Sequence, residues 1–142
     1  MIGGQVVDME GPSKISSIED LKYMYSLKTG ALIKSSLVAG AVLGGAKKTE
    51  IKALETYGEK LGIAFQIKDD ILDVTGTQEM LGKTIGSDAA NNKITYLTFK
   101  SMEESKADVE KLTEEAIGSI KVFGSKAKYL LELAKYLTHR EK

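Results

Sequence analysis

The chain has 142 residues, with 20 basic and 20 acidic side chains and no cysteine. This length predicts one domain with a substantial core. The balanced charge does not favour a nucleic acid partner, and the missing thiols exclude both a disulfide framework and a thiolate metal site. The N-terminal residues do not form a signal peptide pattern, so we expect a cytoplasmic protein.

The first part of the chain predicts two helices. Residues 1–8 look like the tail of a helix, and the glycine and proline in residues 11–13 would end it. Ser16 and Glu19 have the spacing of a capping box. They predict the start of a second helix from about residue 18 to residue 43, and the glycine pair that follows would stop it.

The apolar stretch 29–46 resembles a membrane span in length. Lys34 is its only charged residue, and it also contains two serines and several glycines. The charge and the scarcity of large apolar side chains make insertion unfavourable. We therefore predict no membrane span and interpret this stretch as a buried helix whose small residues allow close packing.

A third helix is expected from about Thr49 to Val74, and it carries an acidic stripe. Four polar residues follow the spacing i, i+3, i+4 and i+7, which we interpret as one helix face. They are Gln66, Asp69, Asp70 and Asp73. Apart from Lys68, the rest of residues 61–74 is apolar or glycine, a pattern typical of a buried helix.

Three carboxylates on such a helix repel one another and lose hydration unless a cation lies among them. A salt-bridged surface stripe is the alternative interpretation. However, the chain otherwise uses glutamate, the better helix former, with 13 Glu against 7 Asp. Short carboxylates on a rigid helix suit a hard cation, so the sequence predicts a Mg²⁺ site at Asp69, Asp70 and Asp73.

Residues 75–93 lose the helical pattern and predict a long glycine-rich loop, with room for a short helix at residues 78–81. Loops of this length are often functional. Lys83, Asp88 and Lys93 come just after the acidic stripe. We interpret the lysines as phosphate contacts, with solvated loop lysines as the alternative.

Two more helices complete an all-α prediction, because no strand pattern is present. The first covers residues 94–123 and ends at Gly124-Ser125. The second covers residues 126–142, and we expect one of its faces to be buried. That face consists of Tyr129, Leu130, Leu133, Ala134 and Leu137. The single histidine, His139, is expected on the surface rather than in a site.

These motifs together resemble the second aspartate-rich region of trans-isoprenyl diphosphate synthases. The resemblance rests on Phe65-Gln66, Asp69-Asp70-Ile71-Leu72-Asp73, Leu81-Gly82-Lys83, Gly86, Asp88 and Lys93. Upstream, Lys28-Thr29 looks like the Lys-Thr pair of that family, and Tyr136, Arg140 and Lys142 resemble its C-terminus. The likeness covers the whole chain and is nearest to short-chain farnesyl and geranylgeranyl diphosphate synthases. Leu97 departs from it, because related sequences often have proline there.

The first aspartate-rich motif of that family is absent from these 142 residues. The resemblance therefore implies that residues 1–142 are the C-terminal half of an isoprenoid synthase helical bundle. The parent protein would be a Mg²⁺-dependent trans-prenyltransferase that condenses an allylic diphosphate with isopentenyl diphosphate. We expect this portion alone to be inactive.

The resemblance also implies roles for individual residues. Asp69 and Asp73 would hold Mg²⁺ against the diphosphate, and Asp70 and Asp88 would act through metal-bound water. The expected catalytic group is Lys28, Thr29, Gln66 and Asp69. The expected substrate contacts are Lys28, Thr29, Gln66, Lys83, Lys93, Arg140 and Lys142, the last two near isopentenyl diphosphate unless they are simply solvated charges.

The resemblance further implies a homodimer, and the small residues at positions 39–41 would support close helix contact. Two alternatives stay open. A non-catalytic subunit related to the family would share the helices but bind metal weakly. A plain helical interaction module would make the acidic stripe a salt-bridged surface.

Overall fold

Every regular element in the described part of the chain is helical. The structure is a computed structural model that describes residues 1–10, 15–75 and 93–140. Its elements are α1 (Ile2–Glu10), α2 (Ile18–Tyr25), η2 (Ser26–Gly30), α3 (Ala31–Leu43), α4 (Lys48–Thr75), η3 (Tyr96–Thr98), α7 (Met102–Ser119), η4 (Ile120–Ala127) and α8 (Lys128–His139). The all-α prediction is confirmed.

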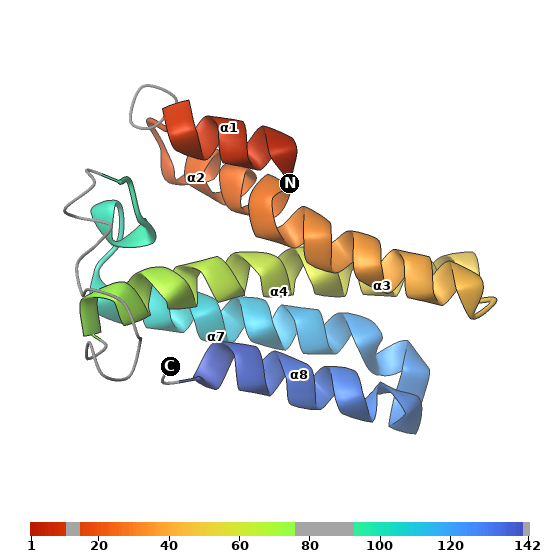
Figure 1. The fold of residues 1–142 in the computed structure, drawn as a ribbon. Helices are drawn as coiled ribbons and strands as arrows, with labels where there is room; N and C mark the ends of the chain where they lie inside the picture. Colours follow the sequence, from red (N-terminus) through yellow and green to blue (C-terminus); the bar gives the residue numbers. More distant parts are fainter. Residues whose placement is uncertain (11–14, 76–92, 141–142) are drawn as a thin grey trace.

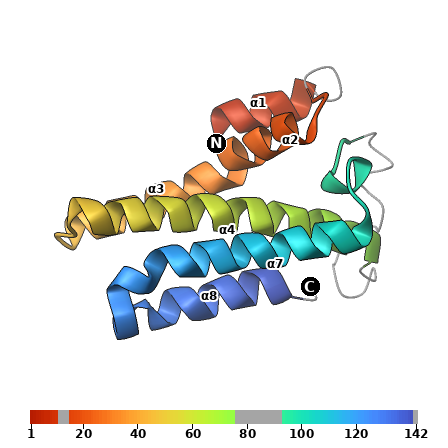
Figure 2. The same ribbon diagram turned by 180° about the vertical axis from the view of Figure 1, so that it is seen from behind.

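The longest helix, α4, lies at the centre of the bundle. Helix α3 runs along one side of α4 and α7 along the other, and α8 packs on α7 (Figure 1). The short helix α1 packs on α2 and η2, as the view from behind also shows (Figure 2). The π-helical turn η2 therefore lies between α1 and α4, which becomes important for the site.

The helix predicted over residues 18–43 is present, but a five-residue π-helical turn interrupts its regular spacing. Helix α2 continues into η2 and then α3, and the Ala31 amide donates to the Ser26 carbonyl five residues back. The N-cap is Ser17 with Asp20, one residue later than the predicted capping box. The Asp20 carboxylate accepts from the amides of both Ser16 and Ser17, which fixes this register.

Two apolar clusters hold the helices together. The first joins α2, α4, η3 and α7 at one end of the bundle, through Leu21, Met24, Tyr25, Ile67, Ile71, Tyr96 and Val109. The second joins α4, α7, η4 and α8 at the other end, through Leu54, Tyr57, Leu61, Ala116, Ile120, Ala127 and Ala134. Helix α4 contributes to both clusters, as expected for a helix that is mostly apolar.

The C-terminal helices differ from the prediction in their start and in their buried face. The expected helix from residue 94 begins instead at Met102, because Ser101 and Glu104 form a capping box there. In α8, Tyr129 is 81% and Leu133 40% exposed, whereas Ala134 is buried. The core face follows residues 127, 131, 134 and 138, a spacing that overlaps the predicted one. His139 is exposed, as predicted.

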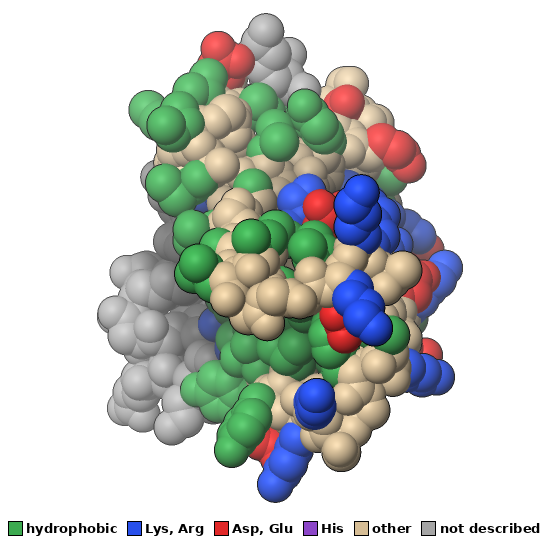
Figure 3. Space-filling view, turned by 90° about the vertical axis from the view of Figure 1, so that its right-hand side faces the viewer, with side chains coloured by type: hydrophobic (Ala, Val, Ile, Leu, Met, Phe, Trp, Pro, Cys, Tyr) green, Lys and Arg blue, Asp and Glu red, His purple; other side chains and the backbone are tan. Residues whose placement is uncertain are grey.

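One helical run, Ile18–Leu43, is long and apolar enough to cross a membrane by length and composition. The same criteria also select helices that pack inside protein bundles, and this run packs along α4. The prediction of a buried helix in this stretch is wrong for Ala31–Leu43, because α3 has no buried residue. In an end-on view, hydrophobic side chains gather on one side of the molecule and charged side chains on the other (Figure 3).

The Tyr57 side chain links α4 to α8, and its hydroxyl should make the stability of the fold depend on pH. The hydroxyl donates to the Leu130 carbonyl at 2.6 Å, and burial raises the pKa of Tyr57 to about 12. Unfolded tyrosine loses its proton near pH 10, so this contribution to stability is present below pH 10 and is lost as the pH rises towards 12. We expect Tyr57→Phe to cost about 1 kcal/mol at pH 8 and to flatten the alkaline loss of stability in urea unfolding.

The matched control is Tyr129→Phe, which changes an exposed tyrosine on the neighbouring helix. This variant should leave both the stability at pH 8 and its alkaline decline unchanged. An identical pH profile for Tyr57→Phe and the unaltered chain would contradict the role given to this hydroxyl.

Candidate functional site

The candidate site lies along one face of α4. At about 100° per residue, five residues of this helix fall within an arc of roughly 80°. They are Gly58, Gly62, Gln66, Asp69 and Asp73. Two glycines thus precede three polar residues on the same face. Gly58 packs on α3 and lies outside the candidate site, whereas Gly62 packs on η2 beside it.

Asp70 lies at the edge of this face, about 40° around the helix from Gln66 and about 100° from Asp69. It is only 4% exposed. The Tyr25 hydroxyl and the Tyr96 amide both donate to its Oδ2, the latter at 2.6 Å. Asp70 therefore connects α4 to α2 and η3, which gives it a structural role, and its predicted metal role stays a prediction.

Asp69 lies at the centre of a small polar cluster. It is 40% exposed and accepts a hydrogen bond from the Gln66 amide at 3.2 Å. The Arg140 guanidinium donates to its other carboxylate oxygen and stacks over the Phe65 ring, 4.1 Å from the centroid. The fold thus brings Arg140 from the end of α8 to the acidic face, 71 residues away in sequence.

Asp73 lies one turn beyond Asp69 and is 1% exposed. Neither Asp70 nor Asp73 therefore extends into bulk solvent. Within the described ranges, no group of three His, Cys, Asp or Glu side chains is arranged to hold a metal ion. Protein Mg²⁺ sites commonly use only one or two carboxylates together with water and substrate phosphates, so Asp69 and Asp73 fit such an ion in number and chemistry.

The predicted Lys-Thr pair lies in the π-helical turn η2. The Lys28 ammonium forms an ion pair with Asp8 of α1 at 2.6 Å, and its side chain is 27% exposed. The turn contacts α4 at Gly62, and Asp69 lies seven residues further along, about 10 Å along the helix axis at 1.5 Å per residue.

The remaining predicted site residues are placed only in part. Lys93 is half-buried and has an interaction with the rest of the chain. Lys83, Asp88 and Lys142 lie outside the described residues, so their assigned roles stay predictions.

Sequence reasoning missed the residues that support the site. Asp8 pairs with Lys28, Gly4 and Gly62 contact the main chain of η2, and the tyrosines at 25 and 96 hold Asp70. The only sequence signal for the glycines was their four-residue spacing at 58 and 62, which allows two helices to approach closely. Long-range pairs such as Asp8 with Lys28 leave no local pattern.

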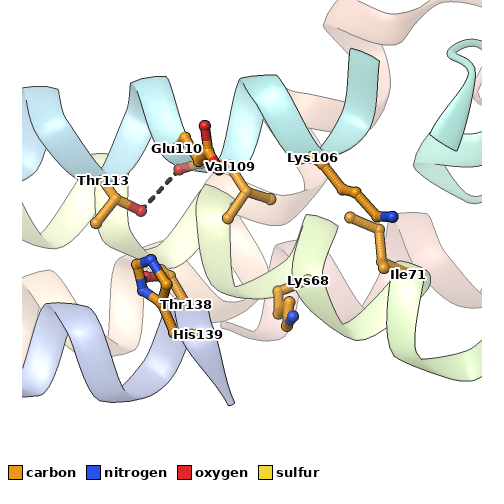
Figure 4. Close-up of a pocket in the computed structure, with 8 residues that line it drawn as sticks. All are labelled: Lys68, Ile71, Lys106, Val109, Glu110, Thr113, Thr138 and His139. Carbon is orange, nitrogen blue, oxygen red and sulfur yellow. Dashed lines mark hydrogen bonds between the residues drawn. The ribbon is translucent and has the colours of Figure 1, made fainter. Parts of the chain in front are cut away.

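A pocket lies between α4, α7 and α8 (Figure 4). Its lining residues are Lys68, Ile71, Lys106, Val109, Glu110, Thr113, Thr138 and His139. The Thr113 hydroxyl at its wall donates to the Val109 carbonyl at 2.7 Å. None of the predicted site residues lines this pocket.

Comparison with known proteins places this arrangement in a family. The family model for polyprenyl synthetases matches residues 1–134. A geranylgeranyl diphosphate synthase of Cyanophora paradoxa is 39% identical over 141 residues, covering 99% of this chain and 47% of that protein. A farnesyl diphosphate synthase of Geobacillus stearothermophilus is 38% identical, covering 98% of this chain and 48% of that protein. The chain thus spans about half the length of these curated relatives.

Solved structures agree with this result. The geranylgeranyl pyrophosphate synthetase of Pyrococcus horikoshii superposes with a TM-score of 0.86 and 28% identity, covering 99% of this chain and 55% of that one. A geranyltransferase of Helicobacter pylori, solved with magnesium and isoprenyl diphosphate, gives a TM-score of 0.78 and 31% identity, covering 98% and 46%. The resemblance inferred from the motifs is therefore confirmed, and the chain belongs to the polyprenyl synthetase family.

Proposed function

We propose that this chain is the C-terminal half of a Mg²⁺-dependent trans-prenyltransferase and that its α4 face binds the diphosphate of an allylic substrate. One observation carries the proposal. Asp69 and Asp73 share the face of α4 that packs, at Gly62, against the turn carrying Lys28 and Thr29. The relatives named as farnesyl and geranylgeranyl diphosphate synthases support this substrate class.

The reaction joins an allylic diphosphate to isopentenyl diphosphate. The diphosphate leaves, the isopentenyl double bond attacks the allylic cation, and a proton is lost. Separating the diphosphate from the cation is the costly step, so catalysis is mainly electrostatic. Asp69 and Asp73 would hold Mg²⁺, which would supply positive charge next to the diphosphate. Lys28 adds a further positive charge on the same side.

The neighbouring polar groups suit the developing cation. The Thr29 hydroxyl and the Gln66 amide provide dipoles without a strong nucleophile that would trap the cation. The π-helical spacing of η2 also changes the main-chain hydrogen-bond pattern next to Lys28 and Thr29. A carbonyl dipole near the allylic carbon would stabilise positive charge there.

We also propose that the whole protein is a cytoplasmic homodimer. Ala39 and Gly40 on α3 are exposed, and a Cβ added to Gly40 would meet no atom within 4 Å. A second helix could therefore approach this surface closely.

Binding of inorganic pyrophosphate with Mg²⁺ tests the proposed site directly. Ligand that binds only the folded chain stabilises it by about 2.7 kcal/mol when free ligand is 100 times the Kd. For a chain of this size, that corresponds to a rise in Tm of roughly 5–10 °C. We expect this rise with both components together and a much smaller one with either alone, measured by differential scanning calorimetry.

Equal thermal stability with and without Mg²⁺ and pyrophosphate would contradict the proposal and favour a helical interaction module. Weak stabilisation at high concentration would point to a non-catalytic relative of the family. We expect no condensation product from this chain by itself, since the sequence holds only the second aspartate-rich region.

A further inference from the structure

The turn that carries Lys28 and Thr29 is held by direct main-chain contacts on both sides. On the α4 side, a Cβ added to Gly62 would lie 2.8 Å from the Gly30 amide nitrogen and closer still to its Cα. On the α1 side, a Cβ added to Gly4 would lie 2.7 Å from the Lys28 Cα and closer still to its amide nitrogen. Side-chain carbons essentially never approach other atoms this closely, so only glycine fits at these two positions.

The glycine inside the turn has no such requirement. Gly30 has ordinary helical dihedrals of −58° and −41°. A Cβ added to it would make only normal contacts, the nearest at 3.7 Å from the Tyr25 carbonyl. The absence of side chains is therefore needed on the helices that pack against the turn and not within the turn itself.

We propose that Gly62 and Gly4 are positioning residues for the diphosphate site. This inference rests on the proposed function. The missing side chains let α4 and α1 pack directly on the main chain of η2, and the Asp8–Lys28 ion pair adds a third contact at 2.6 Å. Because Gly62 shares a helix with Asp69 and Asp73, the contact fixes the distance between the Lys28–Thr29 turn and the two carboxylates.

The chain provides a matched control on the same pair of helices. A Cβ added to Gly58, one turn before Gly62, would lie 2.8 Å from the Lys34 Cα and 3.0 Å from its amide nitrogen. Gly58→Ala therefore forces α4 away from α3 as Gly62→Ala forces it away from η2. Only the second substitution acts on the turn that carries the predicted catalytic pair.

The test compares both variants by titration calorimetry with Mg²⁺-pyrophosphate, at a temperature where urea unfolding shows each to be folded. We expect Gly62→Ala to weaken binding at least tenfold and Gly58→Ala to change it less than twofold. Gly4→Ala, which displaces the turn from the opposite side, should behave like Gly62→Ala and serves if Gly62→Ala does not fold. Equal weakening in the variants at 58 and 62, or none in either, would overturn the proposal.

Hydrogen exchange gives a second readout that needs no ligand. Amides of residues 26–31 should exchange faster in Gly62→Ala than in the unaltered chain, whereas Gly58→Ala should affect residues 33–38. If the unaltered chain binds no pyrophosphate but exchange changes as expected, the proposed function fails and the packing role stands. If binding is normal and exchange at residues 26–31 is unchanged in Gly62→Ala, the positioning role fails alone.

Discussion

Asp70→Ala should destabilise the chain by about 4 kcal/mol, because it removes the acceptor of two buried hydrogen bonds and each such loss costs roughly 1–3 kcal/mol. The Tyr25 hydroxyl and the Tyr96 amide both donate to this one carboxylate oxygen. Small domains are stable by only about 5–15 kcal/mol, so this loss is a large share of the total. Urea unfolding monitored by circular dichroism measures it.

A double-mutant cycle with Tyr25→Phe separates the hydrogen bonds from other effects. Removing the tyrosine hydroxyl deletes one of the two donors, so Asp70→Ala should cost less in that background than in the unaltered chain. A small effect on stability combined with complete loss of Mg²⁺-pyrophosphate binding would instead support the predicted metal role of Asp70.

Asp69→Ala should have the opposite profile, with little effect on stability and a large effect on binding. Asp69 is 40% exposed and its ion pair with Arg140 lies partly in water, so we expect a loss of only about 1 kcal/mol. Removal of a partner that merely supports a metal ligand already costs about 10–100-fold in affinity. We therefore expect Mg²⁺-dependent pyrophosphate binding to fall by more than about 100-fold in titration calorimetry.

Glu55→Ala is the matched control for Asp69→Ala. Glu55 lies on the same helix, is 37% exposed and also pairs with a basic side chain, Lys52. Its loss should leave binding unchanged. Pyrophosphate binding by Asp69→Ala equal to that of the control would remove the basis of the proposed metal site.

The sequence predicted the helices well, because caps and glycines act locally. The helix stop at Gly44-Gly45 is present, and Gly45 has a positive φ. The stop predicted at Gly124 comes earlier, because α7 ends at Ser119 and Gly124 forms a kink of positive φ inside η4. The buried face of α8 was harder to predict, because two overlapping stripes satisfy the same helical spacing. Contact with α7, α4 and η4 selects between them.

Helical spacing alone also fails to predict the surroundings of the acidic stripe. Helical spacing placed Asp70 beside Asp69, but its environment depends on tyrosines that are 45 residues before it and 26 residues after it. No local pattern encodes such contacts. Likewise, the family resemblance implies a kink near Lys28 and Thr29 that Gly30 would permit. The space for the π-helical turn at residues 26–30 comes instead from the adjoining Gly4 and Gly62.

The exposed position of α3 has a consequence for how the molecule opens locally. Its 13 residues contain none that is buried, and an isolated helix of this length is only marginally stable in water. We therefore expect fraying to begin at the Gly44-Gly45 corner and to progress backward through α3 towards Lys28, while the centre of α4 is still closed. Thermal motion at a remote surface corner would thus reach the turn that carries Lys28 and Thr29 along a single continuous helical run.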